Sequence, residues 1–299
     1  MVDSGGGGAD AGVGTGAALL HAGVINLGGF LLILFAPLFS LSVAAQTLVI
    51  VVAGLSMLIA GLVMMTRISI KVRLAWSTTA QMALMLVECA LGLYELALVH
   101  MLAHSCYKAF AFLSAGDDVA DYLRAQRREQ VAPELPAWLV AACIIVPGVA
   151  VSALLNGSTA FPLAPWLVVS AALMILIAQF VAVGGWQQIL RAACLSLLLL
   201  VCYLLLKGTM TSVIPAHGHV YSALFDFWVI SLFAVQVLVY LQLQYRPASL
   251  PSHRLFIALN AGFYLDEWMT RLTLKWWPIS LPRDNKANPA VQPGEMLHE

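Results

Sequence analysis

Charged side chains are scarce in this chain of 299 residues, of which only 10% are charged and 61% are apolar. Ordinary soluble domains carry about a quarter charged residues, so the composition excludes that class. The formal net charge is zero, so the chain also lacks the basic surface with which proteins bind nucleic acid. We therefore expect a membrane protein with no nucleic-acid partner.

Residues suited to metal binding or redox chemistry are few and poorly placed. The five cysteines lie inside apolar runs without a C-x-x-C pair, which favours small buried hydrophobes over metal ligands or disulfides. His217 and His219 form an H-x-H pair, and Asp226 could add a third ligand, but two ligands alone are weak evidence for a metal. The glycine-rich start, Met1–Gly16, has no phosphate-binding G-x-x-x-x-G-K-[ST] motif. We expect no metal, no cofactor and no enzyme active site.

Long apolar runs dominate the rest of the chain and predict an all-α, polytopic bundle of about eight transmembrane helices. The runs cover roughly 18–39, 43–65, 72–91, 94–115, 137–155, 164–184, 188–206 and 222–244. Residues 1–17 are expected to be a flexible glycine-rich start, residues 18–245 the transmembrane domain, and residues 246–299 a cytoplasmic tail.

Basic residues are concentrated in alternate loops between these runs. If all eight runs cross, the same side of the membrane receives Arg67, Lys71, Arg73, Arg124, Arg127, Arg128, Arg191, Arg246 and Arg254. The positive-inside rule makes this side cytoplasmic. The prediction is therefore a multi-pass protein of the cell inner (plasma) membrane with both termini in the cytoplasm.

The most informative stretch runs from Lys71 to Gly116, where two apolar segments meet at Gly92. The second segment carries His100, His104 and Lys108, whose spacing of four residues places them on one helical face about 12 Å long. Such groups are costly to place in lipid, so they should face protein or trapped water. Polar groups strung along one face are what a proton pathway needs.

Two further titratable residues are candidates for the same pathway. Glu88 lies deep enough in the preceding segment to accept a proton or to pair with another group. His21 lies near one end of the first run, beside Asn26 and several glycines. It is either an interfacial histidine or one more station on the polar path.

The tail contains an amphipathic stretch, expected to form a helix over about 253–278. It mixes aromatic and aliphatic side chains with charges, and it should lie on membrane lipids or dock a partner. The candidate docking residues are Asp266, Glu267, Trp268 and Arg271.

Three stretches resemble a known family: L-L-H-A-G-V-I-N-L-G-G-F-L-L-I, K-V-R-L-A-W-S-T-T-A-Q-M-A-L-M and L-V-H-M-L-A-H-S-C-Y-K-A-F-A-F-L-S-A-G. They are similar to the antiporter-like subunits shared by respiratory complex I, its L-type subunit, and Mrp cation/proton antiporters. Within that superfamily, A-W-S-T-x-A-Q-M, H-S-x-Y-K-A-x-A-F-L-S-x-G and the tail motif F-Y-L-D-E-W-x-T-R-L-T resemble the DabB type.

The resemblance implies a membrane subunit of an energy-coupled transporter of CO2 or bicarbonate, driven by protons or other cations. Its expected partner is a soluble, carbonic-anhydrase-like DabA-type subunit. His21, His100, His104 and Lys108 match family positions that line a hydrated proton pathway, and histidine suits this task because it titrates near neutral pH. The resemblance covers most of residues 18–280 and implies the C-terminal portion of a longer type of subunit, through truncation, a split gene or an alternative start.

Two other functions stay open on the sequence. One is a proton-pumping subunit of NADH-quinone oxidoreductase or of an Mrp antiporter. The other is a non-conducting remnant in which the polar groups only pair between helices, as buried polar side chains of membrane bundles often do.

Overall fold

The computed structural model describes residues 16, 18–114, 133–155, 163–182, 185–211, 222–246 and 248–277. Most of the glycine-rich start, most of the charged loop after the fourth apolar run, the pair His217 and His219, and residues beyond 277 lie outside this part. Within it the chain is helical and contains no strand, which confirms the all-α class.

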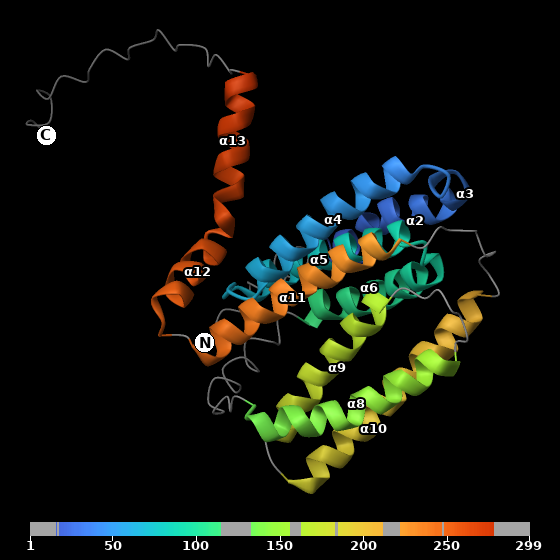
Figure 1. Ribbon diagram of the computed structural model, residues 1–299. Helices are drawn as coiled ribbons and strands as arrows, with labels where there is room; N and C mark the ends of the chain where they lie inside the picture. The colour runs from blue at the N-terminus through green and yellow to red at the C-terminus, as the bar shows by residue number, and fades with distance from the viewer. Residues whose placement is uncertain are drawn as a thin grey trace, which may run out of the picture. The chain divides into compact units, whose positions relative to one another are not determined.

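Helices occupy all eight stretches that the apolar runs predicted (Figure 1). The first run holds η1 (Val24–Asn26), α2 (Leu27–Leu34) and α3 (Ala36–Phe39), and the others hold α4 (Val43–Met64), α5 (Ile70–Ala90), α6 (Tyr94–Leu113), α8 (Leu135–Leu155), α9 (Leu163–Ala182), α10 (Trp186–Thr211) and α11 (Ala223–Tyr245). The tail holds α12 (Leu250–Asn260), η3 (Gly262–Tyr264) and α13 (Leu265–Trp276).

Among the described residues, five helices are long and apolar enough to cross a membrane: α4, α6, α9, α10 and α11. Three predicted runs fall short for local reasons. The first run is broken into short pieces, α5 carries several charged and hydroxyl side chains, and α8, which contains Pro147, counts only as the shorter apolar helix Leu135–Pro147. The count of eight crossing segments therefore stays a prediction.

The first apolar run is not one straight helix. It tightens into η1 after Gly23, and a second break at Phe35 separates α2 from α3. Its glycines also allow close packing, because a Cβ atom at Gly29 would collide with the side chain of Met85 on α5. Glycines of this run thus accompany one local break, at Gly23, and permit one close helix contact, at Gly29.

The helices pack in two groups. One group combines α2, α4, α5, α6 and α11 around a core that includes Ile50, Met85, Val87, Ala97 and Val229. In Figure 1, α4, α5 and α11 run side by side, in agreement with their contacts. The other group packs α8, α9 and α10 around a smaller apolar cluster that contains Ile145 and Ile177.

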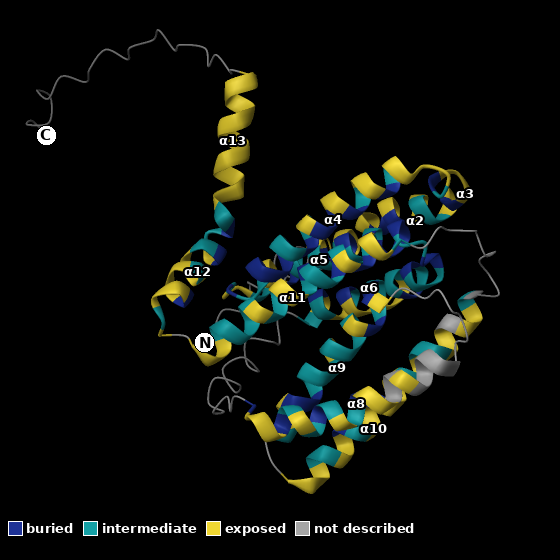
Figure 2. Cartoon of the chain, viewed as in Figure 1, coloured by how far each residue is buried: buried dark blue, intermediate teal, exposed yellow. Residues whose placement is uncertain are grey.

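The outer faces of these helices are apolar. Large apolar side chains remain exposed on these helices, for example Leu48 on α4 and Leu198 and Leu205 on α10. Exposed residues, drawn in yellow, recur along the helices in Figure 2. Exposed leucines on long helices are what lipid requires, since the bilayer replaces water as the surrounding solvent.

The tail differs from the single amphipathic helix expected over 253–278. It forms two helices, α12 and α13, separated by the turn of η3. The chain also divides into two compact units, Met1–Asn260 and Ala261–Glu299, so α12 belongs with the first unit and α13 with the second. The cause of the break is local, because Gly262, Phe263 and Tyr264 all have positive φ angles.

Candidate functional site

The candidate site is built on the hairpin of α5 and α6. The turn between them has Gly92 at φ 75°, a left-handed conformation that glycine adopts without steric cost. The Leu93 N–H donates to the carbonyl of Glu88 at 2.9 Å and the Gly92 N–H donates to that of Cys89 at 3.0 Å. This pair of bonds is a Schellman cap, which ends α5 and directs α6 back along it.

Lys108 is fully buried on α6 and its ammonium is held by the neighbouring helix. Nζ donates to the Leu74 carbonyl at 2.9 Å and also to the Ser77 hydroxyl, both on α5. A buried ammonium is tolerated only where such acceptors replace water. The Ser77 hydroxyl thus takes part in a hydrogen bond between two helices, a common role of hydroxyl side chains in membrane bundles.

Glu88 and His100 form a second polar contact between α5 and α6. The His100 Nδ1 lies 3.1 Å from each carboxylate oxygen of Glu88. Glu88 is buried and His100 is half-buried. The pair is an ion pair whenever the imidazole is protonated, so it can store a proton between the two side chains.

His104 lies on α6 between these two contacts, one helical turn from each. It is only 3% exposed, and neither ring nitrogen has a hydrogen-bond partner among the described residues. Its ring meets that of His100 edge-on, with the ring centroids 6.4 Å apart. Buried polar atoms are nearly always hydrogen-bonded, so this ring calls for water or a proton-carrying neighbour.

His21 lies close to the Lys108 end of this row. Its ring stacks on Phe112, one turn beyond Lys108 on α6, with centroids 4.8 Å apart. The Nδ1 of His21 is buried and has no hydrogen-bond partner among the described residues. Of the two interpretations left open, the structure places His21 against α6 beside the row, and its participation in a pathway stays a prediction.

Asn26 is a neighbour of the site that the sequence reasoning did not single out as a candidate. Its Nδ2 donates to the Ala22 carbonyl and to the Ser105 hydroxyl, both at 2.8 Å. The amide therefore satisfies a carbonyl near the break in the first run and ties that run to α6, at the residue next to His104. The sequence feature that could have identified Asn26 is its position, an amide within a glycine-rich, apolar run, five residues after His21.

The four tail residues predicted to dock a partner lie on α13, in the second compact unit. Asp266, Glu267, Trp268 and Arg271 are all exposed. Glu267 and Arg271 form an ion pair one turn apart, with 3.6 Å between Oε2 and Nη2. Their exposure leaves them available to a partner.

No group of three potential metal ligands occurs among the residues that the structure describes. Asp226, considered above as a third ligand, instead caps α9 by accepting from the Leu163 N–H at 2.7 Å and the Ala164 N–H at 3.3 Å.

The cysteines differ from the expectation of burial. Cys89 is buried, but the other four are exposed: Cys106, Cys143, Cys194 and Cys202.

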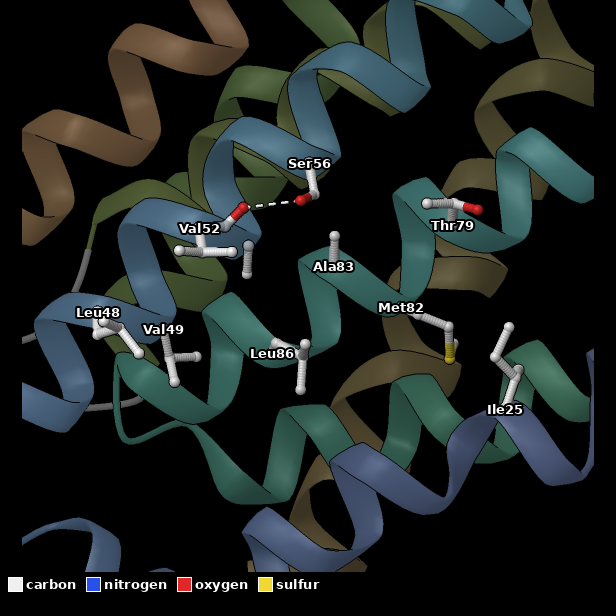
Figure 3. A pocket seen from close by; sticks show the side chains of 10 residues that line it. Ile25, Leu48, Val49, Val52, Ser56, Thr79, Met82, Ala83 and Leu86 are labelled. Atoms are coloured by element: carbon white, nitrogen blue, oxygen red, sulfur yellow. Dashed lines mark hydrogen bonds between the residues drawn. The ribbon is translucent and has the colours of Figure 1, made fainter. Parts of the chain in front are cut away.

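An apolar groove lies beside the site, between α4, α5 and η1 (Figure 3). It measures about 370 Å³ and is lined mainly by aliphatic side chains, among them Ile25, Val52 and Leu86. The Ser56 hydroxyl at its edge donates to the Val52 carbonyl of its own helix at 2.8 Å. Since no titratable group lines it, the groove is not a place for proton chemistry.

Comparison with known proteins gives two kinds of match. Residues 10–132 match the family model described as NADH:quinone oxidoreductase/Mrp antiporter, TM. This segment contains α5 and α6 and therefore all the residues of the candidate row.

Along nearly its whole length the chain is similar to proteins named as carbon transporter subunits. It is 42% identical over 283 residues to a probable inorganic carbon transporter subunit DabB of Hydrogenovibrio crunogenus, covering 95% of this chain and 54% of that protein. It is 31% identical over 290 residues to DabB2 of Halothiobacillus neapolitanus, covering 93% and 52%.

A shorter match is 35% identity over 101 residues to NADH-quinone oxidoreductase subunit L of Rhodobacter capsulatus, covering 33% of this chain and 14% of that protein. The chain spans about half the length of the two carbon transporter subunits. The relatives that match nearly the full chain are named as transporter subunits, in agreement with the prediction of a transporter subunit rather than an enzyme.

Proposed function

Because the chain belongs to the antiporter-like membrane subunits of the complex I and Mrp superfamily, with DabB-type relatives along nearly its whole length, we propose that it is a membrane subunit of an inorganic-carbon transporter. Its task is to pass protons across the membrane and so drive the capture of CO2 or bicarbonate. The carbon-transport part of this proposal comes from the names of its relatives.

The observation that carries the proton-transfer part is the row of Glu88, His100, His104 and Lys108. His100 and Lys108 are hydrogen-bonded to α5, while the ring of His104 between them is buried and has no hydrogen-bond partner among the described residues. A neutral imidazole accepts a proton on one nitrogen and releases one from the other, so His104 can relay between the ends through intervening water. His21 extends the row on the Lys108 side. Protons fit this row better than metal cations, since oxygen cages are what hard cations require.

The coupling partner in this proposal is a soluble, carbonic-anhydrase-like DabA-type subunit on the cytoplasmic side of the inner membrane. The loop charges support this orientation, with both termini in the cytoplasm. The charged face of α13 offers a docking surface through Asp266, Glu267 and Arg271. Movement of charge along the row would then bias the reaction at the partner's site.

The test is carbon uptake in a bacterium that lacks carbonic anhydrase and grows only at high CO2. Expression of the chain with its genomic neighbours should restore growth and uptake of labelled bicarbonate in air, and a protonophore should abolish both. Lys108→Ala should reduce uptake to background, since it removes the ammonium at one end of the row. Lys71→Ala is the matched control, because Lys71 is an exposed lysine on the same hairpin. Full uptake by Lys108→Ala at equal membrane abundance would refute the pathway.

A second function is favoured by the match to subunit L over about a third of the chain. In this case the chain would serve a proton-pumping NADH-quinone oxidoreductase or an Mrp antiporter. Carbon uptake would then be absent, and inverted membrane vesicles would show NADH-driven or sodium-driven proton movement that depends on Lys108. If carbon uptake, NADH-driven proton movement and sodium-driven proton movement were all absent, and proteoliposomes showed no proton flux, the chain would be the non-conducting remnant.

A further inference from the structure

Helix α13 presents a continuous apolar stripe that no described residue of its own compact unit covers. None of its residues is buried. Five apolar side chains recur at helical spacing and are between 38% and 77% exposed: Leu265, Trp268, Met269, Leu272 and Trp276. On a helical wheel they fall within roughly a third of the circumference.

The remaining surface of α13 is polar and its charges cancel. It carries Asp266, Glu267, Arg271 and Lys275, and Glu267 is already paired with Arg271. Leu274 is the one aliphatic residue on this side. With two acidic and two basic groups, the helix has no net charge with which to attract a strongly charged partner. Its main unsatisfied feature is therefore the apolar stripe.

The chain connection keeps α13 near the membrane. Helix α12 packs against α4 and α11, two of the helices long and apolar enough to span, and it buries Ser252 and Leu259. Only Ala261 to Tyr264 separate α12 from α13, and even fully extended this connection reaches no more than roughly 18 Å. The start of α13 cannot move far from the end of the membrane domain, so lipid is always within its reach.

The turn before α13 gives an independent indication that the direction of this helix matters. Phe263 and Tyr264 have φ angles of 55° and 54°, in the left-handed region that residues with a Cβ avoid. Each such residue costs about 1–2 kcal/mol. Strain of this kind persists only where the structure on both sides is held in place. Packing against α4 and α11 holds α12, whereas α13 has no buried residue and no described residue that covers it, so a surface outside the described part of the chain is the natural support for its direction.

We propose that α13 lies in the plane of the bilayer surface, with its apolar stripe at the boundary between headgroups and acyl chains. The occupant of this face is phospholipid, and because the helix is neutral a zwitterionic headgroup is sufficient. Helices of this type bury their apolar face about 5–10 Å into that boundary, and tryptophan is enriched there. Trp268 then contacts lipid, and only the charged side remains for a soluble partner.

The test uses the full chain in nanodiscs of phosphatidylcholine, with single spin labels introduced after its five cysteines have been replaced by alanine. Leu272→Cys and Trp268→Cys report on the stripe, and Thr270→Cys and Asp266→Cys are the matched controls on the polar side. The expected result is that labels on the stripe collide more often with oxygen than with a water-soluble nickel chelate. Labels on the polar side should show the reverse.

Two results would overturn the proposal. One is equal access of the nickel chelate to both sides, which would place α13 in water. The other is protection of the stripe only after a soluble partner is added, which would make it a protein-docking surface. Neither result depends on carbon uptake, so this measurement is separate from the test of the proposed function.

Discussion

The α5–α6 hairpin and the group of α8, α9 and α10 are built from helices of similar length but opposite chemistry. The hairpin buries a carboxylate, an imidazole and an ammonium, and the two ends of this row are bonded across the helices. In the described part of the other group no ionisable side chain is buried, and Ser196 is its one buried polar residue. Burying charge has no benefit for packing alone, since apolar residues of similar volume stabilise at least as well. The difference supports the proposal that the hairpin is the working part and that the α8–α10 group is its support.

This comparison predicts that a packing defect in the α8–α10 group lowers stability without altering transport. Ile177 on α9 is 1% exposed inside the apolar cluster. Ile177→Ala should reduce the free energy of unfolding by about 2–5 kcal/mol, because it leaves a cavity. Chemical unfolding in detergent measures this change. Leu167→Ala is the control, since Leu167 is an exposed residue of the same helix.

Uptake per folded molecule should be the same for Ile177→Ala, Leu167→Ala and the unaltered chain. A specific loss of uptake in Ile177→Ala at equal abundance would show that the α8–α10 group takes part in transport. It would contradict the proposal that this group only supports the hairpin.

A smaller effect is expected for the contact between Glu88 and His100. A double-mutant cycle with Glu88→Gln and His100→Gln should give a coupling energy of about 2 kcal/mol, a value within the range for hydrogen bonds to charged groups. Unfolding in detergent measures the four proteins of the cycle. Glu95→Gln in place of Glu88→Gln is the control, because Glu95 is half-buried in the first turn of α6. Purely additive effects of the two substitutions would mean that the contact is not formed.

The smallest effect is expected for the link between Asn26 and Ser105. The cycle of Asn26→Ala and Ser105→Ala should give a coupling of about 0.6 kcal/mol, the average for polar pairs between membrane helices. Ser56→Ala is the matched control, since the hydrogen bond of its hydroxyl, to the Val52 carbonyl, lies within its own helix. If the link also positions the first run against His104, Asn26→Ala will slow uptake although it changes stability little.

Residue spacing was sufficient to predict the helices and the shared face of His100, His104 and Lys108, because the pitch of a helix fixes both. It also indicated Glu88 as a pairing group. It could not identify His100 as the partner, or Leu74 and Ser77 as acceptors for Lys108, since these contacts depend on the register of α5 against α6. Asn26 was passed over for the same reason, as its role appears only when α6 lies beside it.

In the tail, the sequence pattern predicted more regular structure than the chain adopts. Its amphipathic pattern is continuous across Gly262, Phe263 and Tyr264, so periodicity alone favours one helix. The break arises from backbone angles that two aromatic residues rarely adopt. The outward position of four cysteines was likewise invisible to composition, because in a membrane protein an apolar residue can face either the core or the lipid.

Gly92 has a consequence for how this hairpin can change over evolution. The cap that it closes sets the rotational phase of α6 relative to α5, and a single inserted residue would turn α6 by about 100°. His100 would then lose Glu88, and Lys108 would lose its acceptors, without any substitution among these residues. Loop length at this corner is thus as strict a requirement as the identity of the lysine, although most surface connections tolerate insertions freely.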